Sequence, residues 1–199
     1  MDRLTTRSFL ELLREAVPDA LVVASLGRTA VECAKAFPDS LRLDAMGCVT
    51  PVAAGVALAV DEPSFVVALD TDGSLLMELS ALAVLPAVLE LASERLCVVV
   101  VDNAILEASG AMPRAPAKID WVQLVASFAL RAAIFECGSA EALVRALRDN
   151  DVLIATVDNR GESEPLQPSD VTGREAAVRF RSALARETGR PQPCPAIKP

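Results

Sequence analysis

The feature that most constrains the fold is a series of short runs rich in valine, isoleucine, leucine and alanine. These runs lie at residues 20–26, 65–70, 96–102, 132–137 and 152–158. Uninterrupted apolar runs of this length are typical of strands that are buried on both faces of a sheet. They therefore predict the central strands of a largely buried sheet.

The segments between these runs have the length and apolar spacing of helices. They lie at about residues 29–36, 50–60, 74–93, 119–129 and 139–149, with another near 173–187. Alternation of strand and helix implies right-handed βαβ crossovers and helices on both faces of the sheet. The predicted fold class is α/β, with three α/β/α layers and a mainly parallel sheet of about six strands.

The length and composition indicate one domain. With 199 residues, of which 52% are hydrophobic, the chain can bury one substantial core but not two of ordinary size. We expect the domain to span residues 1–188 and residues 189–199, which are rich in proline, to form a mobile tail.

Charge and cysteine usage exclude several classes of function. A net charge of -8 and scattered lysines and arginines argue against a nucleic-acid surface. The cysteines, at 33, 48, 97, 137 and 194, have neither the spacing of a disulfide framework nor a CxxC motif. The amphipathic start lacks the apolar core of a signal peptide, and no apolar run could span a bilayer. We therefore expect a cytoplasmic protein with no membrane or nucleic-acid partner.

An acidic loop, "LDTDGSLL", follows the second strand and carries Asp70 and Asp72. Both acids fall at the carboxyl edge of the predicted sheet, where open α/β folds bind ligands. One alternative is that they only cap the helix that follows. Another is a resemblance to haloacid-dehalogenase-like phosphatases, which implies Asp70 as nucleophile and Asp72 as acid/base, although only Lys118 and Lys198 follow the loop as candidate phosphate ligands.

A second strand end, in "LCVVVVDNAILEASG", carries Asp102 and Asn103. Together with "DTDG", this pair resembles the diphosphate-binding half of thiamine diphosphate enzymes. The resemblance implies an Mg²⁺ ion held by Asp72, by the amide oxygen of Asn103 and by the carbonyl of Ile105. Such a set suits Mg²⁺, which prefers octahedral oxygen ligands shared with phosphates.

Further cofactor contacts are implied by the same resemblance. The amides of Gly73 and Ser74 would face the diphosphate, and Leu106 stands where the family usually has a tyrosine. Residues 41–60 resemble the segment that wraps the aminopyrimidine, with backbone contacts from Asp44 and Met46. The turn after the first strand would place Gly27, Arg28 and Thr29 near the diphosphate.

Within the family, the likeness is to sulfopyruvate and phosphonopyruvate decarboxylases, over about residues 18–187. It rests on "DGSLLMELSALAVL", "DNAILEASG" and "PLQPSDVTGREAAVRFRSAL". The sequence departs from the family at Thr71, which replaces the first glycine of a GDG motif. It also departs at "AMPRAP", which replaces a glycine-rich continuation.

The resemblance implies that the chain helps to decarboxylate a small anionic 2-oxo acid to an aldehyde. The activating glutamate of this family lies on a pyrimidine-binding domain, for which the remaining residues leave no room. We therefore expect a separate pyrimidine-domain subunit, or self-association, and inactivity of the chain alone. Because the chain has no histidine, Glu107 is a candidate for proton transfer. A non-catalytic homo-oligomeric protein of the same fold is the alternative.

Overall fold

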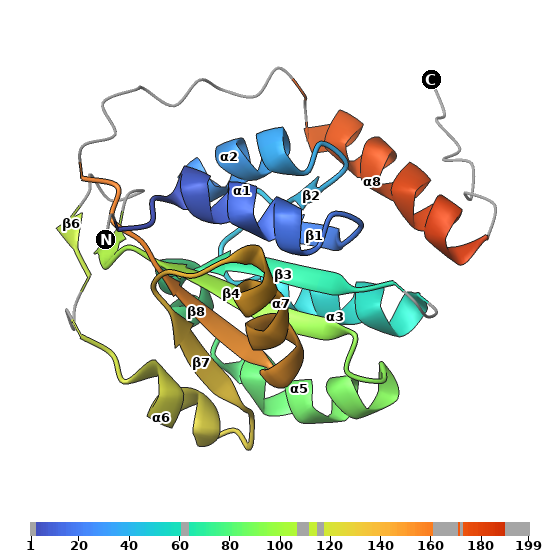
Figure 1. The fold of residues 1–199 in the computed structure, drawn as a ribbon. Helices are drawn as coiled ribbons and strands as arrows, with labels where there is room; N and C mark the ends of the chain where they lie inside the picture. Colours follow the sequence, from blue (N-terminus) through green and yellow to red (C-terminus); the bar gives the residue numbers. More distant parts are fainter. Residues whose placement is uncertain are drawn as a thin grey trace.

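The computed structural model describes residues 3–60, 64–106, 112–114, 118–160, 171 and 173–189. Six parallel strands form its main sheet, in the order β2-β1-β3-β4-β8-β7 (Figure 1). The strands are β1 (Leu21–Ala24), β2 (Leu41–Arg42), β3 (Val66–Thr71), β4 (Leu96–Asp102), β7 (Ala132–Phe135) and β8 (Val152–Thr156). A separate antiparallel pair joins β5 (Ile105–Leu106) to β6 (Met112–Pro113).

The central strands are buried on both faces, as their composition predicts. In β4, alternate side chains point to opposite cores, since Val98 and Val100 belong to one hydrophobic cluster and Cys97 and Val99 to the other. All four are fully buried. Valine suits such positions because a β-branched side chain packs well on a pleated surface.

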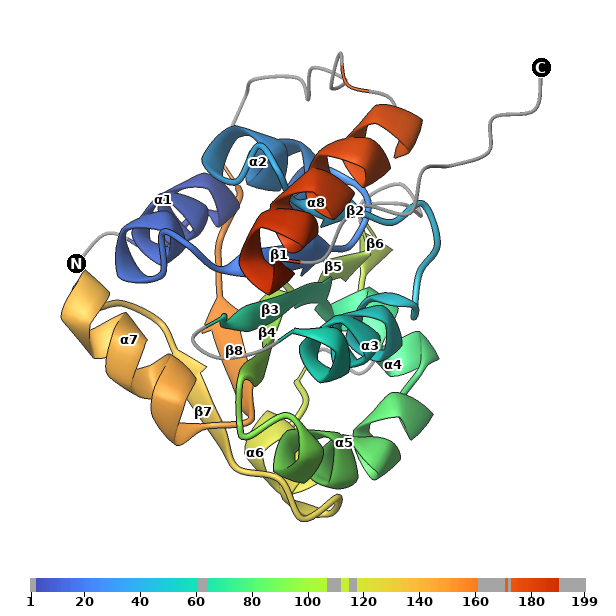
Figure 2. The same cartoon turned by 90° about the vertical axis from the view of Figure 1, so that its right-hand side faces the viewer.

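Helices cover both faces of the sheet, which gives three layers (Figure 2). One face carries α1 (Thr6–Ala16), α2 (Arg28–Ala36) and α7 (Ala140–Asp149). The other carries α3 (Val49–Ala59), α4 (Asp72–Met77), α5 (Ser80–Leu91), α6 (Trp121–Ala126) and α8 (Gly173–Thr188). The predicted fold class is therefore confirmed.

Two features of the fold differ from the sequence-based expectation. The sixth strand, β2, is only two residues long and was not among the predicted runs, because it is too short to produce a pattern. The single helix expected at 74–93 is divided into α4 and α5, since Glu78 leaves helical geometry with φ -140° and ψ 51°. The short helix α4, next to the end of β3, is thereby separated from the apolar helix α5.

The remaining expectations are only partly addressed by the described residues. Residues 190–199 lie outside them, so the predicted tail and domain boundary stay predictions. Cys33, Cys48, Cys97 and Cys137 are free thiols, while Cys194 lies outside the described part. Over the portion of the chain that the structure describes, no helix combines the length and apolarity needed to cross a bilayer.

Candidate functional site

A cavity of about 610 Å³ opens at the carboxyl ends of the central strands. It is lined by Ser25 and Gly27 after β1, by Thr71 and Asp72 at the end of β3, and by Asn103 after β4. From β1 the chain continues outward to β2, whereas β3 leads to β4 on the other side. The cavity therefore lies where the strand order changes direction, which is the usual ligand site of open α/β sheets.

Most of the predicted site residues meet in this cavity. Nine of them line it, namely Gly27, Arg28, Thr29, Met46, Asp72, Gly73, Asn103, Ile105 and Leu106. Three do not. Asp44 is exposed outside the cavity, Ser74 is fully buried beneath it, and Glu107 lies outside the described residues. Their proposed roles toward a cofactor stay predictions.

Thr71, the departure from the glycine of the family motif, occupies ordinary extended backbone with φ -113° and ψ 157°. Its side-chain oxygen accepts a hydrogen bond from the backbone N–H of Ser74 at 3.3 Å. Threonine is thus the N-cap of α4, a position that this residue type favours. The Ser74 amide already has a partner within the protein.

Gly73 has a clear steric reason to be glycine. A Cβ atom placed there would lie 2.9 Å from Cδ2 of Leu106 and 3.7 Å from Cε of Met46. Since real Cβ atoms do not approach other carbons to 2.9 Å, any other residue would displace Leu106. The packing brings together Met46, Gly73 and Leu106, which are far apart in sequence.

Asp70 lies beneath the cavity rather than in it. It is 1% exposed, and its Oδ1 accepts the backbone N–H of Thr71 at 2.9 Å. Burial raises the pKa of its carboxyl, against hydrogen bonds from Ser74 and Thr71 that lower it. A carboxylate in this position cannot reach a substrate in the cavity, so the phosphatase hypothesis loses its nucleophile.

Asp72 belongs to a buried ionic cluster that the sequence did not reveal. The Nε of Arg114 lies 2.6 Å from its Oδ2, and Nη2 of Arg114 lies 3.0 and 3.1 Å from the two carboxylate oxygens of Asp102. Trp121 donates from Nε1 to Oδ2 of Asp102 at 2.6 Å. Burial, followed by repulsion from Asp102, raises the pKa of Asp72 to about 6, although Gly73 and Arg114 act in the opposite direction.

The turn after β4 orients the other predicted metal ligands. Oδ1 of Asn103 accepts the N–H of Ile105 at 2.9 Å, and Oδ1 of Asp102 accepts the N–H of Ala104 at 2.9 Å. Ala104 has a positive φ of 56°, which completes the tight turn. Asn103 also lines the cavity, and an amide oxygen can accept a second hydrogen bond or coordinate a cation through its other lone pair.

The donor chemistry of this edge fits a hard cation. Asp72, Asn103 and Ile105 provide only oxygen atoms, and all three residues line the same cavity. Across the described ranges, no group of three or more histidine, cysteine, aspartate or glutamate side chains could hold a metal by itself. A cation here would therefore need phosphate or water oxygens as well, which is usual for Mg²⁺.

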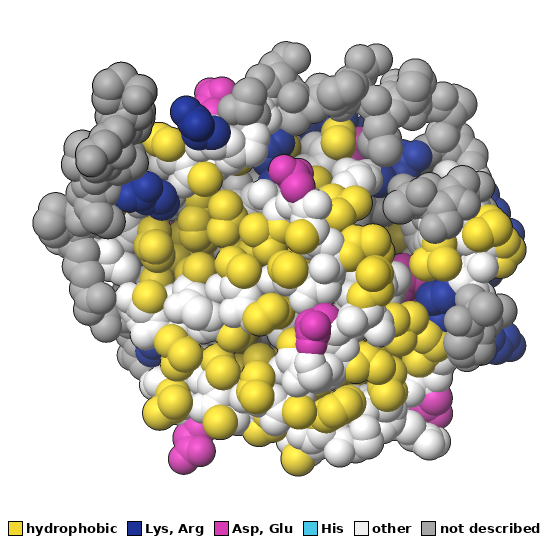
Figure 3. Space-filling view, turned by 180° about the vertical axis from the view of Figure 1, so that it is seen from behind, with side chains coloured by type: hydrophobic (Ala, Val, Ile, Leu, Met, Phe, Trp, Pro, Cys, Tyr) yellow, Lys and Arg dark blue, Asp and Glu magenta, His cyan; other side chains and the backbone are white. Residues whose placement is uncertain are grey.

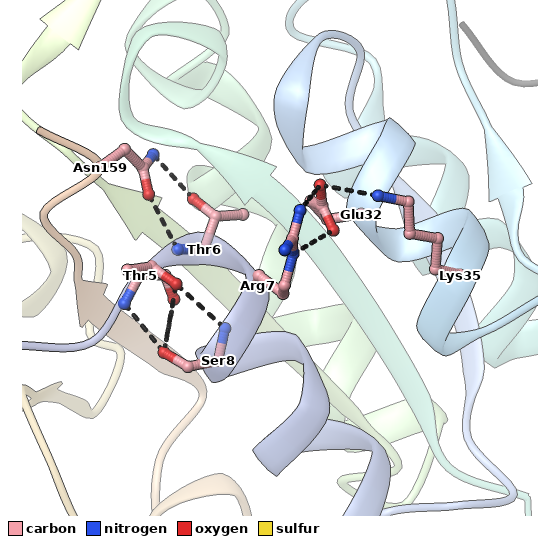
Figure 4. Close-up of polar contacts among 7 residues, drawn as sticks. All are labelled: Thr5, Thr6, Arg7, Ser8, Glu32, Lys35 and Asn159. Atoms are coloured by element: carbon pink, nitrogen blue, oxygen red, sulfur yellow. Dashed lines mark hydrogen bonds and ion pairs between the residues drawn. The ribbon is translucent and has the colours of Figure 1, made fainter. Parts of the chain in front are cut away.

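The cavity also has a wall that the sequence did not indicate. Asn159, after β8, accepts the backbone N–H of Thr6 at 2.9 Å and donates to its hydroxyl at 3.0 Å (Figure 4). Both residues line the cavity. They are too far apart in sequence for any local pattern to join them, so the start of α1 became part of the site only through folding.

Comparison with known proteins identifies the fold and its family. The family model "Thiamine pyrophosphate enzyme, C-terminal TPP binding domain" matches residues 25–153. Phosphonopyruvate decarboxylase of Streptomyces hygroscopicus is 32% identical over 178 residues, which cover 85% of this chain and 43% of that protein. The chain therefore spans less than half the length of this relative.

Solved structures with the same fold include two proteins of low sequence identity. A Mycobacterium smegmatis protein assigned to the thiamin diphosphate-dependent enzymes has a TM-score of 0.58 and 21% identity, covering 78% of this chain and 31% of its own. The 4-hydroxybenzoylformate decarboxylase of Rhodococcus jostii RHA1 has a TM-score of 0.54 and 18% identity, covering 78% and 32%. These two structures show the shared fold. The match to the family model shows that the chain belongs to the thiamine pyrophosphate enzymes, as a C-terminal TPP-binding domain.

Proposed function

We propose that this chain is the thiamine diphosphate- and Mg²⁺-binding part of a decarboxylase for an anionic 2-oxo acid, of the phosphonopyruvate or sulfopyruvate type. The observation that supports this most directly is the convergence of Asp72, Asn103 and Ile105 on one cavity at the carboxyl edge of β3 and β4. These oxygen donors would hold Mg²⁺, which would in turn bind the diphosphate.

The remaining cavity residues divide into a polar and an apolar part. Arg28, at the start of α2, provides a cation for a diphosphate in a chain whose net charge is -8. Met46 and Leu106 meet over Gly73 and form an apolar wall against which a thiazolium ring could rest. When bound, thiamine diphosphate supplies the nucleophilic carbon and the electron sink that decarboxylation of a 2-oxo acid requires.

A partner domain is part of the proposal because one side of the molecule is unusually apolar. Helix α3 contains no charged residue, and α5 contains only Glu90. Leu58, Met77, Val84 and Leu91 are nevertheless 49 to 73% exposed. Viewed from behind, the molecule shows hydrophobic side chains spread over a wide face with few charges (Figure 3). Helices that are apolar on all sides are normally buried, so we expect a pyrimidine-binding domain of another subunit to cover this face.

The decisive experiment is calorimetric titration of the purified chain with thiamine diphosphate, with Mg²⁺ or with EDTA. Binding should require Mg²⁺ and should be lost in Asp72→Asn. A pyrimidine-domain subunit should then be added, and release of CO₂ from phosphonopyruvate and sulfopyruvate measured. We expect turnover only with the added subunit, because the proton-transfer help it brings is commonly worth about 10²- to 10⁴-fold.

The same experiment separates the alternatives. Equally strong cofactor binding in EDTA would contradict the metal assignment. Absence of cofactor binding under every condition, in a chain that forms homo-oligomers in light scattering, would favour a non-catalytic protein of this fold. Turnover by the isolated chain would contradict the need for a second domain.

A further inference from the structure

Arg114 places a positive charge in the cavity where the proposed function puts Mg²⁺. It is 3% exposed and lines the cavity beside Asp72. Its backbone N–H donates to the carbonyl of Ala104 at 2.9 Å, next to the pair formed by β5 and β6. The β5–β6 pair brings the chain back beside the end of β4. The backbone of Arg114 is therefore fixed at the carboxyl edge of the main sheet, where its guanidinium reaches Asp72.

The guanidinium contacts the one carboxylate that the proposed function assigns to the metal. Nε of Arg114 lies 2.6 Å from Oδ2 of Asp72, whereas Nη2 binds both oxygens of Asp102. A divalent cation on Asp72 would meet a positive charge a few ångströms away, inside a buried site where Coulomb repulsion is only weakly screened. The two cations cannot both use Asp72 without a large mutual penalty.

The charges of the cluster explain why Arg114 is tolerated there. The side chains of Asp72 and Asp102 are 4% and 13% exposed. Burying a carboxylate without a nearby cation is energetically costly. Arg114 compensates them within the protein itself. Nη2 of Arg114 binds both carboxylate oxygens of Asp102, so Asp102 can retain the guanidinium when Asp72 turns to another cation.

We propose that Arg114 is an internal counter-cation of the metal site, which holds Asp72 when no metal is bound and releases it when a divalent cation binds. The proposal rests on the metal assignment of the proposed function. Its consequence is that metal affinity is set by competition with Arg114 as well as by the oxygen donors. The "AMPRAP" departure from the family pattern would then lower metal affinity without removing a metal ligand.

Trp121 provides a natural spectroscopic probe of this exchange. It is the only tryptophan of the chain. Its indole donates to Asp102 at 2.6 Å, and Cζ of Arg114 lies 5.7 Å from the centroid of its ring. Movement of the guanidinium away from Asp72 would alter this cation–π contact and hence the emission of the indole.

The test is titration of the full chain with Mg²⁺ alone, followed by calorimetry and by Trp121 emission. Arg114→Gln removes the charge, while Arg114→Lys keeps it and serves as the matched control. We expect Arg114→Gln to bind Mg²⁺ at least about tenfold more tightly than the wild type, because a nearby repulsive charge is removed. Arg114→Lys should stay within about threefold of the wild type.

Wild-type emission should change as Mg²⁺ binds, and Asp72→Asn should abolish the change. This comparison decides the question even if Arg114→Gln does not fold. Equal or weaker Mg²⁺ affinity in Arg114→Gln, or an emission change that persists in Asp72→Asn, would overturn the counter-cation role. If Mg²⁺ binds neither the wild type nor Arg114→Gln, even with thiamine diphosphate present, the metal site of the proposed function fails with it.

Discussion

Two buried carboxylates of this protein, Glu32 and Asp72, have opposite charge environments. Glu32 is on α2 and pairs with a cation from each of two helices (Figure 4). Nε of Arg7, on α1, is 3.3 Å from its Oε2, and Nζ of Lys35, on α2, is 3.0 Å from its Oε1. Glu32 is therefore paired with two cations. Asp72 is paired with Arg114, which also binds Asp102.

The balance of charge decides what each carboxylate can do. Burial opposes ionisation of Glu32, but hydrogen bonds from Arg7 and Lys35 outweigh it and lower its pKa. Burial and repulsion from Asp102 instead raise the pKa of Asp72 to about 6. A carboxylate with two nearby cations forms a structural ion pair. Two carboxylates that share one guanidinium carry a net negative charge when both are ionised, which a cationic ligand would offset.

The largest expected difference between the two carboxylates is in cofactor binding. Asp72→Asn should weaken Mg²⁺-dependent binding of thiamine diphosphate by at least about 100-fold, since even residues that only support a metal ligand contribute about 10- to 100-fold. Glu32→Gln, the matched control, should change affinity less than twofold. Calorimetry on both variants measures the contrast, and similar losses in the two would remove the functional distinction.

The next contrast is in stability against pH without metal. Because the pKa of folded Asp72 is raised from 3.8 to about 6, the stability it contributes is present below pH 4 and lost as pH rises through 6. Asp72→Asn should therefore gain up to about 3 kcal/mol in unfolding free energy relative to the wild type between pH 4 and 7. Urea denaturation across this range gives the difference, which a pH-independent offset would contradict.

Glu32 should show the opposite sign, with a smaller amplitude. Its lowered pKa means that its stabilisation is present above 4.5 and lost as pH falls. Because Arg7 and Lys35 are 41% and 58% exposed, we expect Glu32→Gln to lose only about 1 kcal/mol at pH 7. The loss should shrink toward zero below pH 4 in the same denaturation series. A penalty that grows on acidification would show that Glu32 is not held as an ion pair.

A local effect of similar size concerns Thr71, beside Asp72. Thr71→Val keeps the shape but loses the hydroxyl that accepts from Ser74, and should lower unfolding free energy by about 1 kcal/mol. Thr71→Ser retains the cap and should lose less. Thermal unfolding of the two variants distinguishes them. If valine costs no more than serine, the hydroxyl has a role other than capping.

The sequence predicted the scaffold well because its signals are local. All five apolar runs became strands of the parallel sheet, since burial on both faces forces a composition that can be read directly. The sequence also predicted that Asp72 and Asn103 would lie at one edge of the sheet, for a related reason. Both follow recognisable strands, and parallel strands bring their carboxyl ends to one edge.

The parts of the site that escaped prediction depend on contacts between distant segments. Arg114 lies 42 residues from Asp72, and Thr6 lies 153 residues from Asn159. Neither pair is linked by a periodic pattern or a fixed spacing in the sequence that could have predicted the contact. The sequence also did not indicate that Thr71 caps α4, which its extended backbone allows.

By itself, the sequence determined the layer architecture, five of the six strands of the main sheet and the edge at which most predicted site residues meet, because hydrophobic periodicity and strand ends are properties of neighbouring residues. Tertiary structure alone decided which charges surround Asp72. Only folding brings Arg114, Asp102 and Trp121 within hydrogen-bond reach of one another, and electrostatic balance in a buried site depends on distance and desolvation rather than on order along the chain.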